Sequence, residues 1–352
     1  MNPSPSHRAA QDVDAAAVVA AATALAAGEL VGVATDGFLA LAARADRPET
    51  RMALWEASAR AGASSPSLLR CPDRLELSCE CAGLVRRIAQ RHWPGPLILE
   101  VRAEGDEMRW SNDAWMPLCC PAEPHARALA EAAKVPLLLA TIPQATDATS
   151  FRRLTGTERV LGSRQNALSE LPAWLRVARG VFELRRDGLY SLDTLRTSAG
   201  LAIGFVCTGN TCRSPMAESL ARRLLAKRLG VEPSRIGDFG FRVLSMGTFA
   251  APYQPASAHS VEAVRELGGD LTGHRSQVAT WKLLADLQRV YCLTRVHMDQ
   301  VRLLLPADWP GQLALLDEHR DVTDPIGGSL VDYRECARQI RAALERRLEE
   351  WL

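Results

Sequence analysis

The sequence has almost no excess of charge of either sign. Lysine and arginine together number 42 against 41 aspartate and glutamate residues, so the net charge is +1 over 352 residues. A chain with so little net charge has no global field that attracts nucleic acid or a membrane surface. With 24% charged and 47% hydrophobic residues, the composition is that of an ordinary soluble globular protein, and the length predicts about two domains.

The apolar stretch near the N-terminus is too short to span a membrane. Residues 15–27 are apolar, but they are fewer than the roughly 20 residues that a spanning helix needs. Asp12 and Asp14 precede this stretch, which disfavours a signal peptide. We therefore expect a helix that ends at Gly28, and no membrane partner.

Metal-site spacing is missing as well. The nine cysteines are scattered as Cys79-x-Cys81, Cys119-Cys120 and single residues, without the paired spacing of a metal site. Such a pattern is typical of the reducing cytoplasm, so we expect a cytoplasmic protein with no metal and no cofactor. The sequence shows no internal repeat and no low-complexity tract.

One stretch in the second half carries most of the functional information. The apolar run 201–206 predicts a buried strand, and residues 216–225 predict an amphipathic helix. Pro215 suits the first helical position, because its missing N–H would be unpaired there, and Gly230 is a suitable stop. The segment between them, Val-Cys-Thr-Gly-Asn-Thr-Cys-Arg-Ser-Pro over residues 206–215, therefore predicts a tight loop between a strand and a helix.

That loop has the residues of a nucleophilic phosphate site. The N–H groups of such a loop, with a helix N-terminus behind them, form an anion cradle. Cys207 begins the loop, where the positive potential is expected to lower the pKa of its thiol. Arg213 can offer two donors to phosphate oxygens, and Ser214 can donate to the cysteine sulfur. This pattern favours a thiolate nucleophile over a buried structural cysteine beside a surface arginine.

Residues 207–219 resemble the phosphate loop of the low-molecular-weight protein tyrosine phosphatase family. They are closest to its bacterial protein-arginine-phosphatase branch, in which a threonine follows the Gly-Asn pair as Thr211 does here. The resemblance implies a phosphocysteine intermediate, a phosphorylated protein as substrate, Cys207 as nucleophile and Arg213 as a catalytic phosphate ligand. It also implies that the phosphate is held by Thr208, Gly209, Asn210, Thr211, Cys212, Arg213 and Ser214.

The resemblance extends to supporting residues further along the chain. Residues 245–248, Ser-Met-Gly-Thr, are similar to the turn that supports the family's phosphate loop. Ser245 and His274 would join Asn210 and Ser214 in a polar network that holds the loop rigid. Asn210 also has an independent reason, because asparagine tolerates left-handed backbone conformations.

The remaining site residues follow from the same resemblance. Asp324 stands before Pro325 at the family's usual distance and would be the general acid. Thr211, Phe249 and Ile326 would shape the substrate pocket, although Phe249 is equally compatible with a core aromatic, and Ile326 stands where an aromatic residue is usual. The threonine hydroxyl and the missing aromatic wall favour phosphoarginine over phosphotyrosine.

An arsenate reductase remains an alternative for this half. That activity would need further cysteines to relay a disulfide, and Cys212 is the loop's nearest neighbour of this kind. Beyond the acid, Ser329 and Asp332 predict the start of a final helix. Its apolar stripe would pack on the sheet through Tyr333, Ile340, Leu344 and Leu348.

In the first half, residues 91–101 resemble the Trp-Pro-Gly-Pro-Leu-Thr signature of the Sua5/YciO/YrdC family, which makes threonylcarbamoyl-adenylate. Most of that family's working residues differ here: Ser58 replaces the lysine of its Lys-x-Arg pair, Cys119 replaces the arginine of its Arg-x-Pro, and its Ser-x-Asn falls near Thr141. The resemblance implies a retained fold with altered or absent catalysis. Threonylcarbamoyl-AMP synthesis, or non-catalytic binding of nucleotide or RNA, are the alternative functions of this half.

Together these patterns predict an α/β protein of two domains. Residues 10–190 would form a mixed α/β domain of the YrdC type, and residues 191–200 a linker. Residues 201–352 would form a phosphatase domain with a central parallel sheet flanked by helices.

Overall fold

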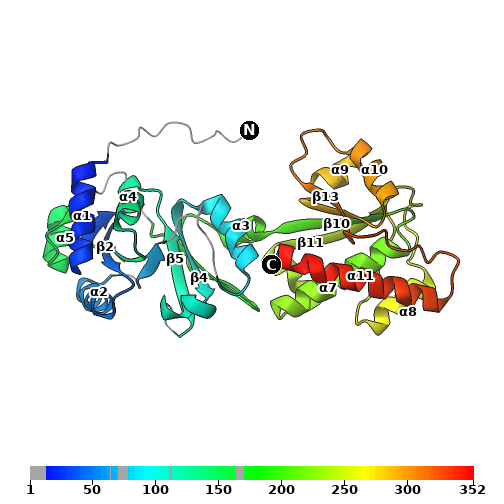
Figure 1. Ribbon diagram of the computed structural model, residues 1–352, viewed down its shortest axis with the longest axis horizontal. Helices are drawn as coiled ribbons and strands as arrows, with labels where there is room; N and C mark the ends of the chain where they lie inside the picture. Colours follow the sequence, from blue (N-terminus) through cyan, green and yellow to red (C-terminus); the bar gives the residue numbers. More distant parts are fainter. Residues whose placement is uncertain (1–12, 64, 70–77, 111–112, 164–169) are drawn as a thin grey trace. The chain divides into compact units, whose positions relative to one another are not determined.

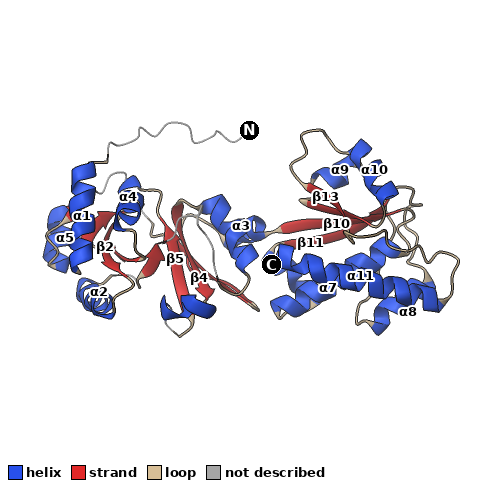
Figure 2. Cartoon of the chain, in the orientation of Figure 1, coloured by secondary structure: helices blue, strands red, loops and turns tan. Residues whose placement is uncertain are grey.

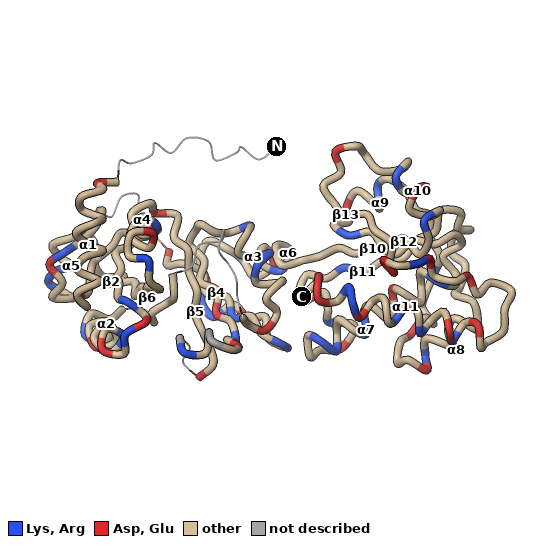
Figure 3. The backbone as a smooth tube through the Cα atoms, viewed as in Figure 1, with Lys and Arg blue, Asp and Glu red and all other residues tan. Residues whose placement is uncertain are grey.

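A computed structural model describes residues 13–63, 65–69, 78–110, 113–163 and 170–352. The chain divides into two compact units between Leu195 and Arg196, each of which is described by itself. Acidic and basic residues are interspersed along the backbone of both units, in keeping with the small net charge (Figure 3). Among the described helices, none combines the length and the apolar character that crossing a membrane requires.

The first unit is built on one large mixed sheet. Its nine strands lie in the order β7-β1-β2-β6-β3-β5-β4-β8-β9, with β1–β7, β3–β5 and β4–β8 parallel and the other pairs antiparallel. Figure 1 labels β2, β4 and β5 of this sheet. The strands are β1 (Val31–Ala34), β2 (Leu39–Arg44), β3 (Ser67–Leu69), β4 (Gly95–Arg102), β5 (Trp115–Cys120), β6 (Leu137–Ile142), β7 (Val160–Leu161), β8 (Ala173–Ala178) and β9 (Val181–Arg186). The helices are α1 (Ala15–Ala27), α2 (Pro48–Ala61), α3 (Ala82–His92), α4 (Pro124–Ala133) and α5 (Ala148–Thr155), with a 3₁₀ turn η2 (Gly105–Trp110).

The first helix begins and ends at the residues that the sequence predicts. The Asp14 carboxylate accepts a hydrogen bond from the Ala16 N–H at 2.9 Å, which caps the helix N-terminus. The helix ends at Gly28, whose φ of +92° favours glycine. Leu25 of this helix and Leu129 of α4 pack into one apolar core with the strands of the sheet.

The predicted linker, residues 191–200, and the segment before it contain regular structure. Strand β9 pairs antiparallel with β8, and its side chains alternate between half-buried and exposed positions. Its polar residues are therefore those of a strand at the edge of a sheet. Helix α6 (Leu192–Ala199) follows and occupies nearly all of residues 191–200.

The second unit has a smaller sheet that is entirely parallel, which confirms the predicted central parallel sheet. Its strands lie in the order β11-β10-β12-β13. They are β10 (Leu201–Cys207), β11 (Phe241–Gly247), β12 (Arg289–Cys292) and β13 (Gln312–Leu315). The other elements are α7 (Arg213–Leu229), η3 (Pro233–Phe239), α8 (Ala258–Glu266), α9 (Trp281–Ala285), α10 (Arg295–Leu304) and α11 (Leu330–Trp351).

Helices cover both faces of this sheet, so its central strand is buried throughout. Helices α7, α8 and α11 lie on one face, and α9 and α10 lie on the other (Figure 2). On the first face Phe205 and Tyr291 pack against Trp351 of α11. Every residue of β10 is buried, as expected for a parallel strand between two helical layers.

The helix after β10 begins earlier than predicted. Arg213 is its first residue and Cys212 its N-cap, so Pro215 is the third helical residue and not the first. Pro215 is still tolerated, because the N–H groups of the whole first turn have no partner within the helix. Gly230 ends the helix with a φ of +71°, as predicted.

The final helix also follows its sequence signals. The Ser329 N–H donates to the Asp332 carboxylate at 2.7 Å, which confirms the predicted start of α11. The apolar stripe predicted for this helix is buried, at Tyr333, Ile340, Leu344 and Leu348.

The end of β11 packs closely against the loop after β10. A substitution at Gly247, the last residue of β11, tests this packing. Gly247 pairs with Cys207, and a Cβ at Gly247 would overlap the Thr208 carbonyl oxygen and lie 2.9 Å from the Asn210 nitrogen. We expect Gly247→Ala to lower the free energy of unfolding by about 1–3 kcal/mol, because backbone atoms must move to admit the methyl group. Urea unfolding of the full chain measures this change.

Gly273→Ala is the matched control for that variant. A Cβ there meets nothing within 4 Å, so we expect no loss of stability. Equal unfolding midpoints for the two variants would contradict the close packing of Gly247 on the loop.

Candidate active site

The loop between β10 and α7 presents a buried cysteine to a hydroxyl group. Cys207 ends β10 and is only 2% exposed. Its Sγ lies 2.9 Å from Ser214 Oγ, which itself lies 3.2 Å from the Met246 carbonyl oxygen. The single Ser214 proton can therefore be donated to the sulfur when the sulfur is a thiolate, as the sequence suggested.

Asn210 holds this phosphate loop (residues 207–214) together from its centre. Its side-chain N–H₂ group donates to Ser214 Oγ and to Ser245 Oγ, each at 2.9 Å, and its Oδ1 accepts from the Gln277 N–H at 2.8 Å. His274 Nε2 lies 2.7 Å from the Asn210 carbonyl oxygen, so this nitrogen carries the donated proton. The structure thus brings together all four residues that the sequence placed in the polar network.

The network continues to a residue that the sequence interpretation missed. Ser245 Oγ donates to Glu218 Oε2 at 2.7 Å, which leaves its lone pair to accept from Asn210. Glu218 lies on α7 within the stretch that resembles the family's phosphate loop. The sequence signal that could have identified Glu218 is an acidic residue on the buried side of the predicted helix.

Asn210 also has the backbone conformation that was expected of it. Its φ is +53°, in the left-handed region that asparagine tolerates better than most residues. The side chain is fully buried, and its amide groups are paired as described above. The backbone conformation of Asn210 and the hydrogen bonds of its side chain therefore both fix the turn of the loop.

The candidate general acid reaches the phosphate loop from the far end of the chain. Arg213 and Asp324 are 111 residues apart in sequence, yet Arg213 Nη2 donates to Asp324 Oδ2 at 2.5 Å. The guanidinium is almost fully buried, while the carboxylate is 42% exposed. Ile326 N–H donates to the other carboxylate oxygen at 3.3 Å and orients it. Cys207, Arg213 and the candidate acid Asp324 thus meet at one loop.

The electrostatics of Cys207 differ from the expectation. Burial raises the pKa of its thiol, opposed by hydrogen bonds from Ser214 and from loop N–H groups and by the charge of Arg213. The predicted lowering of the pKa is therefore wrong for this arrangement of the site. The physical reason is that the desolvation of the thiolate outweighs its stabilisation by the hydrogen bonds and by the charge of Arg213. Arg213 is itself ion-paired with Asp324.

A second missed residue, His297, braces the entrance of the loop. It is 3% exposed, and its ring nitrogens lie 2.9 Å from Thr208 Oγ1 and 2.9 Å from Thr294 Oγ1. Burial and the nearby Arg213 charge lower its pKa to about 4, so the ring is neutral at pH 7. The signal in the sequence was the Thr294-x-x-His297 pattern, since Thr294 caps α10 shortly after β12.

The residues predicted to shape the pocket lie at the surface around this loop. Phe249 is 77% exposed, which rules out the core-aromatic alternative, and its N–H donates to the Thr208 carbonyl at 2.9 Å. Ile326 is 73% exposed beside the acid. Thr211 is half-buried, and its Oγ1 makes only a long contact of 3.7 Å with Cys212 Sγ. Their roles toward a substrate remain predictions.

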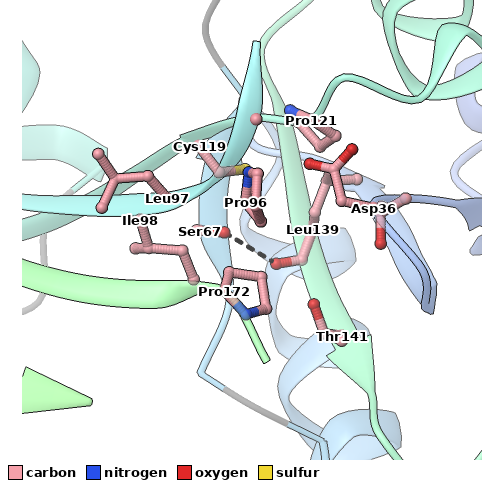
Figure 4. A pocket seen from close by; sticks show the side chains of 12 residues that line it. Asp36, Ser67, Pro96, Leu97, Ile98, Cys119, Pro121, Leu139, Thr141 and Pro172 are labelled. Atoms are coloured by element: carbon pink, nitrogen blue, oxygen red, sulfur yellow. Dashed lines mark hydrogen bonds between the residues drawn. The ribbon is translucent and has the colours of Figure 1, made fainter. Parts of the chain in front are cut away.

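In the first unit, the positions matched to the YrdC motifs surround a very small pocket. Cys119 and Thr141 line it together with Pro96 and Leu97 at the start of β4 (Figure 4). Its volume is about 20 Å³, room for one water molecule, and its described lining residues include no lysine or arginine. Burial raises the pKa of Asp36 at its edge to about 6. These residues do not fit the triphosphate of ATP, which needs cations and space.

A larger cleft in the first unit has a different character. Its volume is about 530 Å³, and three tryptophans and three arginines line it. The Arg176 guanidinium lies 4.2 Å from the centre of the Trp115 ring and donates to Glu100 at 2.5 Å. We call it the Trp–Arg cleft, after the residues Arg51, Trp55, Arg109, Trp115, Trp174 and Arg176 that line it.

Comparison with known proteins matches each half of the chain to a different family model. Residues 23–165 match the Sua5/YciO/YrdC model, which is described as telomere recombination. Residues 202–352 match the model described as low molecular weight phosphotyrosine protein phosphatase. Both matches confirm the resemblances found in the sequence.

Individual relatives match the second unit. A protein-arginine-phosphatase of Bacillus subtilis is 35% identical over 145 residues, which are 40% of this chain and 89% of the relative. The low molecular weight protein-tyrosine-phosphatase PtpB of Staphylococcus haemolyticus is 32% identical over 40% of this chain and 92% of its own length. A solved low molecular weight protein tyrosine phosphatase from T. tengcongensis is 29% identical, with a TM-score of 0.38, over 43% of this chain and 99% of that one.

The buried cysteine, the arginine beside it and the polar network under the loop thus occur in a chain segment that matches phosphatases over most of their length. Through residues 202–352, the chain belongs to the low molecular weight phosphotyrosine protein phosphatase family.

Proposed function

We propose that this cysteine-dependent phosphatase acts on phosphoarginine in proteins, with phosphotyrosine as the alternative substrate. The observation that carries the reaction is the meeting of Cys207, Arg213 and Asp324 at one rigid loop. The choice of substrate is supported by Thr211 and by the 35% identity to a protein-arginine-phosphatase.

The proposed reaction has two steps at the Cys207 sulfur. In the first, the thiolate attacks phosphorus, the bond from phosphorus to the leaving nitrogen or oxygen breaks, and Asp324 gives that atom a proton. In the second, water attacks the phosphocysteine, Asp324 takes its proton, and phosphate leaves. Arg213 and the loop N–H groups hold the three phosphoryl oxygens and stabilise the charge of both transition states.

The ion pair seen in the structure fits this sequence of events. The phosphoryl group and the Asp324 carboxylate compete for the same Arg213 guanidinium. A phosphoryl dianion bound at Arg213 therefore releases Asp324 to face the leaving group. Asp324 can move in this way because it lies on an exposed loop, whereas Arg213 is fixed in the buried first turn of α7.

We propose that two residues at the entrance of the active site, Ile326 and Thr211, determine which leaving group is bound. A phosphotyrosine ring needs apolar walls, but Ile326 projects into solvent instead of an aromatic side chain. A guanidinium instead needs polar partners, and the Thr211 hydroxyl is available because, among the described residues, its hydrogen-bonding contact is the long one with Cys212 Sγ. Both features favour phosphoarginine.

We also propose a reducing, cytoplasmic compartment for the protein. All the cysteines of the described residues are free thiols, and the mechanism requires Cys207 in its reduced form.

The Trp–Arg cleft of the first unit supports a second candidate function, non-catalytic binding of a nucleotide or single-stranded RNA. Both ligands offer a base that stacks on tryptophan and a phosphate that pairs with arginine. Trp55 is half exposed at this cleft, and Arg51 and Arg109 add two guanidinium groups to it. Catalysis like that of the YrdC family is not supported, because the described residues that line the small pocket at its motif positions include no lysine or arginine.

The substrate choice can be tested with Thr211→Ile. Loss of the hydroxyl and gain of an apolar surface are expected to shift the ratio of kcat/KM for phosphotyrosine over phosphoarginine peptides by about 10-fold, or about 1.4 kcal/mol. Thr272→Ile, at an exposed turn, is the control and should leave the ratio unchanged. If the wild type prefers phosphotyrosine and Thr211→Ile keeps its ratio, the phosphoarginine assignment is wrong.

The second candidate function can be tested by fluorescence titration of the full chain with ATP and with a single-stranded RNA oligonucleotide. We expect saturable tryptophan quenching that Trp55→Ala weakens about 10-fold, in line with the loss of one stacking partner. Trp281→Ala, an exposed tryptophan of the second unit, is the control and should retain the affinity. Absence of saturable binding would exclude this function, and formation of threonylcarbamoyl-AMP would restore the catalytic alternative.

A further inference from the structure

One surface loop lies directly against the phosphate loop, and we call it the flanking loop (residues 248–257). Its Thr248 and Phe249 N–H groups donate to the carbonyls of Cys207 and Thr208, each at 2.9 Å. At its other end, the Ser257 N–H donates to the Thr211 carbonyl at 2.9 Å. Because both ends are tied to the phosphate loop, the flanking loop must run along the mouth of the active site.

Tyr253, at the middle of the flanking loop, has an unfavourable backbone conformation. Its φ is +63°, in the region that bulky residues avoid. Buried Ser276 holds it there: its carbonyl accepts from the Tyr253 N–H at 2.8 Å, and its Oγ accepts from the Gln254 N–H at 2.9 Å. The conformation is therefore imposed by the surroundings of the loop.

Packing of the ring does not offset this cost, because the Tyr253 side chain is 80% exposed. Pro252 and Pro255 flank the exposed segment and restrict its backbone. A rigid tyrosine loses little conformational entropy when it binds a partner, so this arrangement suits a contact residue. A strained and exposed aromatic beside an active site points to function.

The chemistry of the flanking loop indicates which partner it fits. Residues 248–258 carry no charged side chain, and Phe249 is exposed on the same loop. Ile326 adds an exposed apolar side chain next to the acid. Tyr253 is four residues from each anchor at Phe249 and Ser257, so its Cα lies within about 14 Å of each anchor, and each anchor is hydrogen-bonded to the phosphate loop. A peptide in extended conformation covers that distance in about four residues.

We infer that Tyr253 is a specificity-determining residue, which contacts an apolar side chain within about four residues of the phosphorylated residue in the protein substrate. This inference rests on the proposed function, since it needs a phosphorylated protein in the active site. It assigns to the flanking loop a contact beyond the phosphorylated side chain itself.

The test compares three substrates with the full chain and its variants. Two are phosphorylated peptides that carry either leucine or glutamate at the positions next to the phosphorylated residue, and the third is p-nitrophenyl phosphate. Tyr253→Asn removes the ring and keeps a residue that tolerates positive φ, and Tyr253→Phe keeps the ring. Leu303→Asn removes an exposed apolar side chain that lies on α10, outside both loops, and serves as the control.

We expect Tyr253→Asn to lower the ratio of kcat/KM for the leucine peptide over p-nitrophenyl phosphate about 10-fold, mainly through KM. Tyr253→Phe should restore the ratio, and Leu303→Asn should leave it unchanged. The wild type should also prefer the leucine peptide to the glutamate peptide, and Tyr253→Asn should lose that preference. Its Tm should be equal to or above that of the wild type, because asparagine relieves the strain.

Three outcomes would overturn the inference, and they are distinguishable. Equal losses on peptides and on p-nitrophenyl phosphate would show that Tyr253 only supports the phosphate loop. An unchanged peptide ratio in Tyr253→Asn would show that no substrate contact exists there, with the phosphatase function intact. A wild type that hydrolyses none of the three substrates would remove both the proposed function and the contact.

Discussion

The buried amide of Asn210 is the interaction on which the active site depends. Its two N–H donors reach Ser214 and Ser245, and its oxygen accepts from Gln277. An amide buried in this way must keep its partners, because an unpaired buried polar group costs about 1–3 kcal/mol. The hydrogen bonds therefore lock three segments that are distant in sequence: the phosphate loop, the end of β11 and the segment before α9. Cys207 and its cradle are rigid because these segments are fixed to one another.

The electrostatics of the site are arranged around one buried cation. Arg213 is fixed at the start of α7 and is held by Asp324, an exposed and movable partner. Burial raises the pKa of the Cys207 thiol, so a thiolate needs the positive field of Arg213 and the loop N–H groups. Neutral His297 braces the loop without adding a second charge next to the arginine. In the proposed mechanism, anion binding, thiol ionisation and release of Asp324 thus depend on the same guanidinium.

Much of this could be predicted from the sequence because it is local. The strand before Cys207, the stop at Gly230 and the start of α11 at Ser329 each depend on neighbouring residues and their hydrogen bonds. The resemblance of the phosphate loop supplied Asp324, far along the chain. The structure then showed the ion pair that joins it to Arg213.

What could not be predicted depends on packing between distant segments. The local patterns at His297 and Glu218 do not name their partners, Thr208 and Ser245, which lie on other segments of the sheet and its loops. The direction of the Cys207 pKa shift required the balance of burial against the cradle. The strained φ of Tyr253 comes from hydrogen bonds to Ser276, which is not a neighbour in sequence.

The central claim, that Cys207 is the nucleophile, is tested most directly by trapping its phosphorylated form. The full chain is mixed with a phosphorylated peptide, quenched in acid within milliseconds and digested for mass spectrometry. The account predicts a phosphoryl group on Cys207 in the wild type and in Cys212→Ser, and turnover in Cys207→Ser lowered by at least about 10³-fold. A phosphoryl group on another residue, or substantial turnover by Cys207→Ser, would contradict it.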